Sequence, residues 1–172
     1  TAEIIAHRFG ISREKMDEFS LQSHQRLAAA QDAGIFKDEL NPVYDRKNHY
    51  YSYDSGLRRD TRLEKLASLK PFFDKSFGLV TAGNSSQVTD GAAFLVLASE
   101  KAVQQYQLPV LARIVDVVWA GVEPSEMGLG PVHAVSILLK KQQLAFNRID
   151  FWEINEAFAG QVLACLAAWQ DI

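Results

Sequence analysis

An amide side chain stands between an apolar segment and a helical pattern near the end of the chain, at Asn155. The preceding residues, 151–154, are predicted to form a strand, and apolar residues with helical spacing follow Glu156. Ligands of open α/β sheets bind where a strand ends and a helix begins. An Asn there could hold a water or donate to a developing oxyanion. Asn is also a preferred N-cap, and local spacing alone favours that structural role.

A second candidate site is the small-residue segment 82–86, Ala-Gly-Asn-Ser-Ser, which follows another strand-like stretch. Small side chains let a ligand approach the backbone closely, and free N–H groups and hydroxyls could bind an amide-containing ligand. The alternative, favoured by local pattern, is a surface turn. The segment is not a phosphate-binding loop, because the Lys and the Gly spacing of that motif are missing.

Two further groups of residues could contact a ligand. Paired hydrogen bonds from basic side chains could neutralise phosphates, or these side chains could form a solvated face. The basic residues are Arg58, Arg59, Arg62, Lys65 and Lys70. Met127 and Gly128, just before Gly130 and Pro131, form an apolar lip at a helix start, where core packing is the default interpretation.

The single cysteine, Cys165, excludes an internal disulfide and a cysteine-based zinc site. It lies in the middle of a helical pattern, where we expect a buried, inert thiol. The four histidines lack metal-ligand spacing, so no metal is expected.

The elements that would position these residues alternate along the second half of the chain. Apolar runs at 92–98, 111–120 and 151–154 predict strands, each followed by a helical pattern. Earlier, helices are predicted over 1–10, 12–33 and 62–69, with Ser12 as N-cap and Gly34 as stop signal; residues 34–62 are expected to be mostly irregular. The order predicts an α/β fold with layered architecture.

Composition describes an ordinary globular chain of 172 residues, 48% hydrophobic and 23% charged. Its net charge of −3 gives no support to nucleic-acid binding or a polybasic membrane anchor. The chain opens at Thr1 without Met and stops inside a helical pattern, so we expect a segment of a longer polypeptide.

Taken in order, these segments resemble the thiolase family. The resemblance rests on colinear motifs: VTAGNSS and TDGAA at 80–93, MGLGP at 127–131 and NEAFAGQ at 155–161. It is supported by TAE at 1–3, ISRE at 11–14, the SHQ…AAA helix at 23–30, FKDEL-x-P at 36–42 and ASLKPFFD at 67–74. It implies a thiolase-like αβα fold of layered sheets with an α-rich loop domain, present here only in part.

The resemblance implies acyl transfer between coenzyme A thioesters, by Claisen condensation or by thiolytic cleavage of 3-ketoacyl-CoA. In the family a nucleophilic Cys takes the acyl group, a second Cys acts as acid and base, and two oxyanion holes stabilise negative charge. The nucleophile is expected upstream of Thr1, and the GHP and CxGGG motifs downstream of Ile172. These 172 residues alone are therefore expected to be inactive, and Cys165 is not assigned as their nucleophile.

The resemblance also assigns site residues. Asn155 matches the Asn that holds an oxyanion-hole water, and Phe158 and Met127 match residues of the acyl pocket. Ser86 and Ala82 match contacts of the pantetheine arm, Phe73 a residue packed along it, and Arg58 a basic residue near the nucleotide phosphates. Coenzyme A would be substrate or product, with no tightly bound cofactor.

The implied domains are the later part of the coenzyme-A-covering loop domain at 1–85, the end of the N-terminal core domain at 86–107 and the start of the C-terminal core domain at 108–172. A dimer or tetramer is implied, with a β-oxidation partner subunit as a further partner. The implied location is the cytoplasm, or the mitochondrial matrix in a eukaryote. Run 92–98 is expected to lack strand neighbours and to expose apolar surface.

Several motifs, including DSGLR at 54–58, resemble the long-chain type that degrades fatty acids, whereas Asn155 and MGLGP resemble the short-chain type. Direction and chain length therefore stay open, with a lean to degradation. The alternative function is a non-catalytic member of the fold that binds acyl-CoA or lipid. The tyrosine-containing stretch 44–62 departs from both types and is a candidate partner- or membrane-facing surface.

Overall fold

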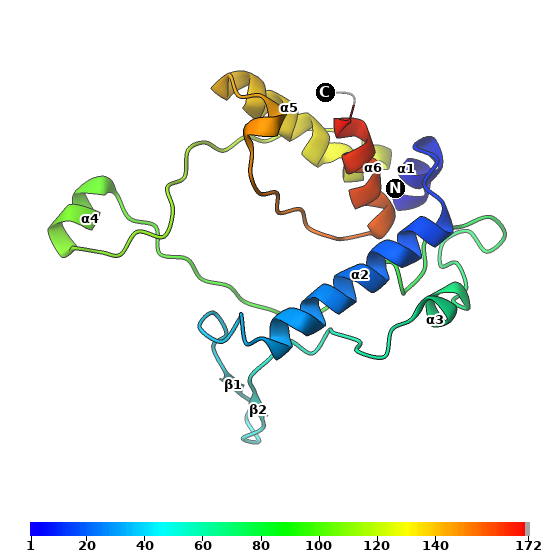
Figure 1. Ribbon diagram of the computed structural model, residues 1–172, viewed down its shortest axis with the longest axis horizontal. Coiled ribbons are helices and arrows are strands. Elements are labelled where there is room, and N and C mark those ends of the chain that lie inside the picture. The colour runs from blue at the N-terminus through cyan, green and yellow to red at the C-terminus, as the bar shows by residue number, and fades with distance from the viewer. Residues whose placement is uncertain (171–172) are drawn as a thin grey trace.

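The computed structural model describes residues 1–170, in which helices are joined by long connections (Figure 1). The elements are α1 (Ala2–Arg8), α2 (Arg13–Asp32), β1 (Val43–Tyr44), β2 (Tyr50–Tyr51), α3 (Leu63–Ala67), α4 (Glu100–Tyr106), the 3₁₀ helix η1 (Pro124–Leu129), α5 (Gly130–Gln142), the 3₁₀ helix η2 (Phe146–Arg148) and α6 (Ala159–Trp169). Among the helices of this described range, none is both long and apolar enough to cross a membrane.

Local signals in the sequence fix several helix ends. The Ser12 hydroxyl accepts a hydrogen bond from the Lys15 N–H over 3.3 Å, which confirms the predicted cap of α2. Gly34 follows that helix with a φ of +68°, a conformation that glycine adopts without a steric penalty. Ser99 caps α4 in the same way, by accepting from the Ala102 N–H over 3.2 Å.

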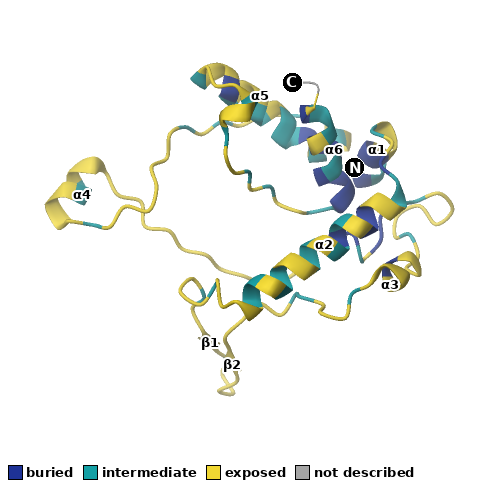
Figure 2. Cartoon of the chain, viewed as in Figure 1, coloured by how far each residue is buried: buried dark blue, intermediate teal, exposed yellow. Residues whose placement is uncertain are grey.

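The core lies where α1, α6 and η1 meet, and α2 also packs against α6. Figure 2 shows the buried residues gathered in this part of the molecule. Ile5 and Ala6 of α1 pack toward Ala164 of α6 and Met16 of α2, all of them completely buried. Helix α6 is the central element, because α1, α2 and η1 all pack against it.

The prediction of three strands in the second half of the chain is wrong for this structure. Residues 92–98, 111–120 and 151–154 run as open chain, and no sheet includes them within residues 1–170. A strand needs a neighbour to accept and donate its backbone hydrogen bonds, and none of the described segments pairs with them. The apolar residues of the first run are consequently exposed, Phe94 by 94% and Val96 by 91%. This confirms that the run lacks neighbours.

The stretch 34–62 is more ordered than predicted, because it contains a short antiparallel hairpin. Val43 pairs with Tyr51 and Tyr44 with Tyr50. Asn48 supplies the turn with a φ of +61°, and Asp45 accepts hydrogen bonds from the backbone N–H groups of Lys47 and His49. The hairpin stands at the far end of α2, away from the core (Figure 1).

Candidate active site

The serine-rich turn and the residues before α6 form one backbone unit. The Ser86 N–H donates to the Ala157 carbonyl over 2.9 Å, and the Ala159 N–H donates to the Asn84 carbonyl over 3.0 Å. Ser85 and Phe158 form an antiparallel bridge between these two hydrogen bonds. Segments more than 70 residues apart in the sequence are thus fixed side by side.

A buried polar network holds the turn against α2. The Asn84 amide donates to the Leu79 carbonyl over 3.0 Å and accepts from the Thr81 N–H over 2.8 Å. Its nitrogen also donates to Asp17, which forms an ion pair with Arg13 over 2.8 Å. Asn84 and Thr81 are almost fully buried, so these hydrogen bonds determine the shape of the turn.

The structure decides against the N-cap interpretation of Asn155. Helix α6 begins at Ala159, its N-cap is Phe158, and no side chain caps it. The physical reason is the pairing of Phe158 with Ser85 of the serine-rich turn, which keeps Phe158 extended and delays the helix by three residues. The Asn155 side chain is therefore not used in capping.

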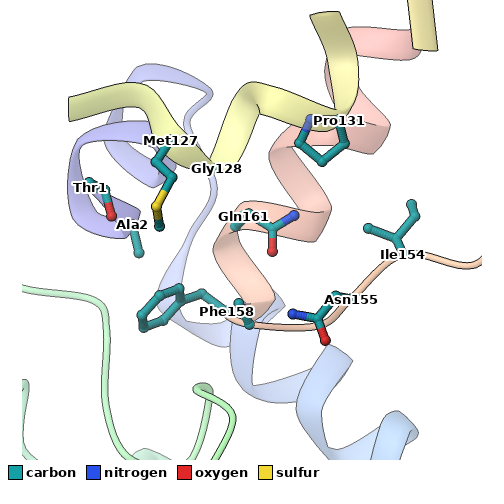
Figure 3. Close-up of a pocket in the computed structure, with 10 residues that line it drawn as sticks. Thr1, Ala2, Met127, Gly128, Pro131, Ile154, Asn155, Phe158 and Gln161 are labelled. Atoms are coloured by element: carbon teal, nitrogen blue, oxygen red, sulfur yellow. The ribbon is translucent and has the colours of Figure 1, made fainter. Parts of the chain in front are cut away.

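Asn155 instead lines a cavity of about 190 Å³ beside the N-terminus of α6 (Figure 3). Phe158 and Met127 line the same cavity, so three of the predicted site residues meet there. Its other walls come from the start of α1, the η1–α5 junction and the chain before α6. Those lining residues are Thr1, Ala2, Gly128, Pro131, Ile154, Ala157 and Gln161.

The cavity combines apolar walls with few polar groups, as small-molecule sites do. Phe158, Met127 and Pro131 supply apolar surface, whereas Asn155 and Gln161 bring amide groups. An amide that lines a cavity can hold a water or donate to negative charge. This arrangement suits stabilisation of a carbonyl oxygen that gains charge.

The remaining predicted site residues do not line this cavity. Ser86 and Ala82 are exposed on the serine-rich turn. Phe73 is 61% exposed and packs edge-to-face on Phe72, with ring centroids 5.0 Å apart. Arg58 is exposed, and its backbone N–H donates to Nδ1 of His24 over 3.4 Å.

Helix α2 connects Arg58 to the segment that carries Asn155. His24 contacts Arg58, and the neighbouring Ser23 hydroxyl donates to the Glu156 carboxylate over 2.5 Å. Partial burial and the positive charge of Arg58 lower the pKa of His24. The structure thus brings Arg58 to the same side of the molecule as residues 155–156.

Two other residues of the basic cluster form ion pairs at the surface. Arg59 pairs with Asp32 over 2.9 Å, and Lys65 pairs with Asp60. Arg62 and Lys65 line a separate shallow hollow together with Glu64 and Ser68. These residues match the solvated-face interpretation. Within residues 1–170, the structure pairs Arg58 with no carboxylate.

Gln161 was missed at the sequence level although it lines the cavity. It lies three residues after Phe158, a spacing that places both side chains on one side of a helical turn. It is also the one amide in the otherwise apolar sequence of α6. A polar side chain on an apolar helix was the signal that could have identified it.

Family models match nearly the whole chain. The thiolase N-terminal domain matches residues 1–101, and the thiolase C-terminal domain matches residues 108–170. Peroxisomal 3-ketoacyl-CoA thiolase B of Rattus norvegicus is 47% identical over 174 residues, covering 96% of this chain and 41% of the relative. The chain therefore spans about two fifths of that relative's length.

Solved structures agree with the sequence relatives. Human mitochondrial 3-ketoacyl-CoA thiolase in complex with CoA has a TM-score of 0.90 and 48% identity, over 95% of this chain and 41% of that one. The dimeric peroxisomal thiolase of Saccharomyces cerevisiae has a TM-score of 0.91 and 40% identity, over 97% and 42%. The α/β fold expected from the motifs is confirmed, and the chain belongs to the thiolase family.

Proposed function

We propose that this chain is part of a thiolase that transfers acyl groups between coenzyme A thioesters, in the degradative direction that cleaves 3-ketoacyl-CoA. One observation carries the proposal: Asn155, Phe158 and Met127 line one cavity whose base is joined by backbone hydrogen bonds to the serine-rich turn. The names of the rat and human relatives, 3-ketoacyl-CoA thiolases, support this reaction class.

In this proposal Asn155 acts on the thioester oxygen. The oxygen gains negative charge when a nucleophile attacks the carbonyl or when an enolate forms, and a water held by the amide donates to it. Phe158 and Met127 surround the acyl group with apolar surface and exclude other water. The residues that attack and transfer protons are proposed to lie outside these 172 residues.

Coenzyme A is proposed to enter as substrate and leave as product along the exposed side of the serine-rich turn. Ser86 and Ala82 would contact the pantetheine arm, since both are exposed beside the residues that pair with 157–159. Phe73 would pack along that arm with its exposed ring. Arg58 would contact phosphate, because its guanidinium is exposed and pairs with no carboxylate in the described residues.

Domain organisation, assembly and location extend the proposal. We assign 1–85 to the loop domain, 86–107 to the N-terminal core domain and 108–172 to the C-terminal one, supported by separate family matches on either side of residues 102–107. A homo-oligomer is supported by the dimeric yeast relative. A β-oxidation partner subunit is proposed from the reaction class alone. Peroxisomal and mitochondrial relatives favour an organelle of fatty-acid oxidation in a eukaryote.

The isolated 172 residues are proposed to lack this activity. Their one thiol, Cys165, is buried in the middle of α6, and burial raises its pKa. A thiol that stays protonated is a poor nucleophile. Cys165 therefore does not replace the family's nucleophile.

The test uses the full-length protein that contains residues 1–172. Purified protein is mixed with a 3-ketoacyl-CoA and free coenzyme A, and loss of the 3-ketoacyl absorbance and formation of acetyl-CoA are followed. Catalysed thiolysis supports the proposal, and the isolated segment serves as a matched inactive sample. Tight binding of acyl-CoA without turnover would reject the enzyme and favour the non-catalytic binder.

A further inference from the structure

One polar atom in the cavity wall has no hydrogen-bond partner, the Oε1 oxygen of Gln161. The residue is only 6% exposed and lies in the first turn of α6. Figure 3 shows its amide above the gap between Phe158 and Asn155, with the oxygen directed toward that gap. Buried side-chain oxygens in native proteins nearly always have a partner, which can be an ordered water.

The orientation of the Gln161 amide follows from its neighbour Cys165. The Cys165 thiol donates its one proton to the Gly128 carbonyl over 3.2 Å. The sulfur can therefore only accept from Gln161, whose Nε2 lies 3.8 Å away. The nitrogen faces the sulfur, and the oxygen is left for the cavity. Burial raises the pKa of the thiol, which keeps the donated proton in place.

In the described part of the chain, no residue around the Gln161 Oε1 oxygen donates a hydrogen bond to it. Met127, Pro131 and Ile154 present apolar side chains to the cavity. Asn155 brings an amide to the same cavity, but the structure pairs it with no atom of Gln161. The cavity volume of about 190 Å³ exceeds the roughly 30 Å³ that one water occupies in the liquid.

We propose that Gln161 is a positioning residue whose Oε1 accepts a hydrogen bond from the water that Asn155 holds. The Asn155 amide donates a hydrogen bond to the oxygen of this water. The water donates one hydrogen bond to Gln161 Oε1, and its other O–H points toward the thioester oxygen. Two protein contacts fix the direction of that last proton, whereas Asn155 alone would let the water rotate. The inference rests on the proposed function and adds a second residue to it.

A crystal structure of the full-length protein that resolves ordered waters tests the contact directly. The wild type should show a water within hydrogen-bond distance of both Gln161 Oε1 and Asn155. Gln161→Met, which keeps the length of the side chain but has no strong acceptor, should lack that water. Its kcat for a short 3-ketoacyl-CoA should fall about tenfold or more while KM stays nearly unchanged.

Matched variants separate positioning from folding. Gln170→Met changes an exposed Gln at the other end of α6 and should leave kcat and the water unchanged. Gln161→Glu keeps the acceptor oxygen and should retain the water even if Gln161→Met folds poorly. Gln170→Met should also unfold close to the wild-type temperature, because the residue is exposed.

Two results would overturn the inference: a wild-type crystal with no water at Gln161 Oε1, or a Gln161→Met variant that turns over as fast as wild type. A different result would reject the proposed function. A wild-type protein with the bridging water but no thiolysis would reject the enzyme and still support the water contact.

Discussion

Asn84 donates a hydrogen bond from Nδ2 to Oδ1 of Asp17 over 3.0 Å, and both side chains are almost fully buried. The two residues lie 67 positions apart, one on the serine-rich turn and one on α2. Asp17 is further held by its ion pair with Arg13, whose guanidinium also donates to the Leu66 carbonyl over 2.7 Å. Helix α2, α3 and the turn consequently form one rigid support beneath the candidate site.

Replacing Asn84 with Ala should loosen this support. The change leaves the Thr81 N–H and the Leu79 carbonyl without partners in a buried place, and the Asp17 carboxylate keeps only its ion pair with Arg13. The expected loss is about 3 kcal/mol of unfolding free energy, since each unsatisfied buried group costs roughly 1–3 kcal/mol. Denaturant unfolding of the full-length protein measures it. The exposed Asn41→Ala is the control, and equal stability of the two variants would contradict the network's role.

Replacing Asn155 with Ala should reduce turnover and leave coenzyme A binding nearly unchanged. Its amide lines the cavity and caps no helix, so under the proposed function its removal takes away a contact made when the thioester oxygen is charged. Loss of one oxyanion donor typically lowers kcat by about 10²–10³-fold. Steady-state thiolysis and calorimetric titration with coenzyme A measure the two effects.

Asn147→Ala is the matched control for this variant, because Asn147 is exposed in η2 and does not line the cavity. It should behave as wild type. Unchanged turnover of the Asn155 variant would reject the oxyanion role, and a large loss of coenzyme A affinity would point to a binding role instead.

The sequence correctly predicted the helix ends that depend on neighbouring residues alone. Ser12 and Gly34 mark the two ends of α2 because a hydroxyl or a missing Cβ acts within one turn. The cap assigned to Asn155 was wrong in position, since the pairing of Phe158 with Ser85 decides where α6 begins. Gln161 was missed because its proposed role also depends on Gly128, which lies 37 residues before Cys165 and which only the fold brings to that thiol. The placement of Arg58 and Phe73 outside the cavity was likewise not visible in the sequence.

Gly128→Ala should distort the wall of the cavity. A Cβ at this position would lie 2.8 Å from both Gln161 Cγ and Ile5 Cδ1, in a packed region. Overpacking of this kind costs about 1–3 kcal/mol. We expect a lower unfolding temperature and a displaced Gln161 side chain, seen by crystallography. Gly130→Ala is the control, since nothing lies within 4 Å of its added Cβ. Equal melting of the two variants would contradict the tight packing.

His24 should make stability depend on pH. Burial and Arg58 lower its pKa in the folded state below the ordinary value of 6.5. Below that value the unfolded chain binds a proton that the folded chain resists, so stability falls as pH drops from 6.5 toward the folded pKa and then levels off. His24→Gln should weaken this slope between about pH 7.5 and 5.5, measured by thermal unfolding. His133→Gln, exposed on α5, is the control, and identical slopes in wild type and His24→Gln would contradict the shift.

The apolar run 92–98 should drive association of the isolated segment. Leu95 and Leu97 are 88% and 75% exposed, on a stretch whose backbone is paired with no described residue. Exposed apolar surface with free backbone groups favours edge-to-edge pairing between chains. Residues 1–172 alone should therefore elute as oligomers in size exclusion with light scattering.

Changing Leu95 and Leu97 together to Glu should shift the sample toward monomer, because charges oppose stacking of the run. Leu63→Glu, at an exposed site on α3, should not. A monodisperse monomer of the unmodified segment would refute this prediction, because the run would then be covered in solution.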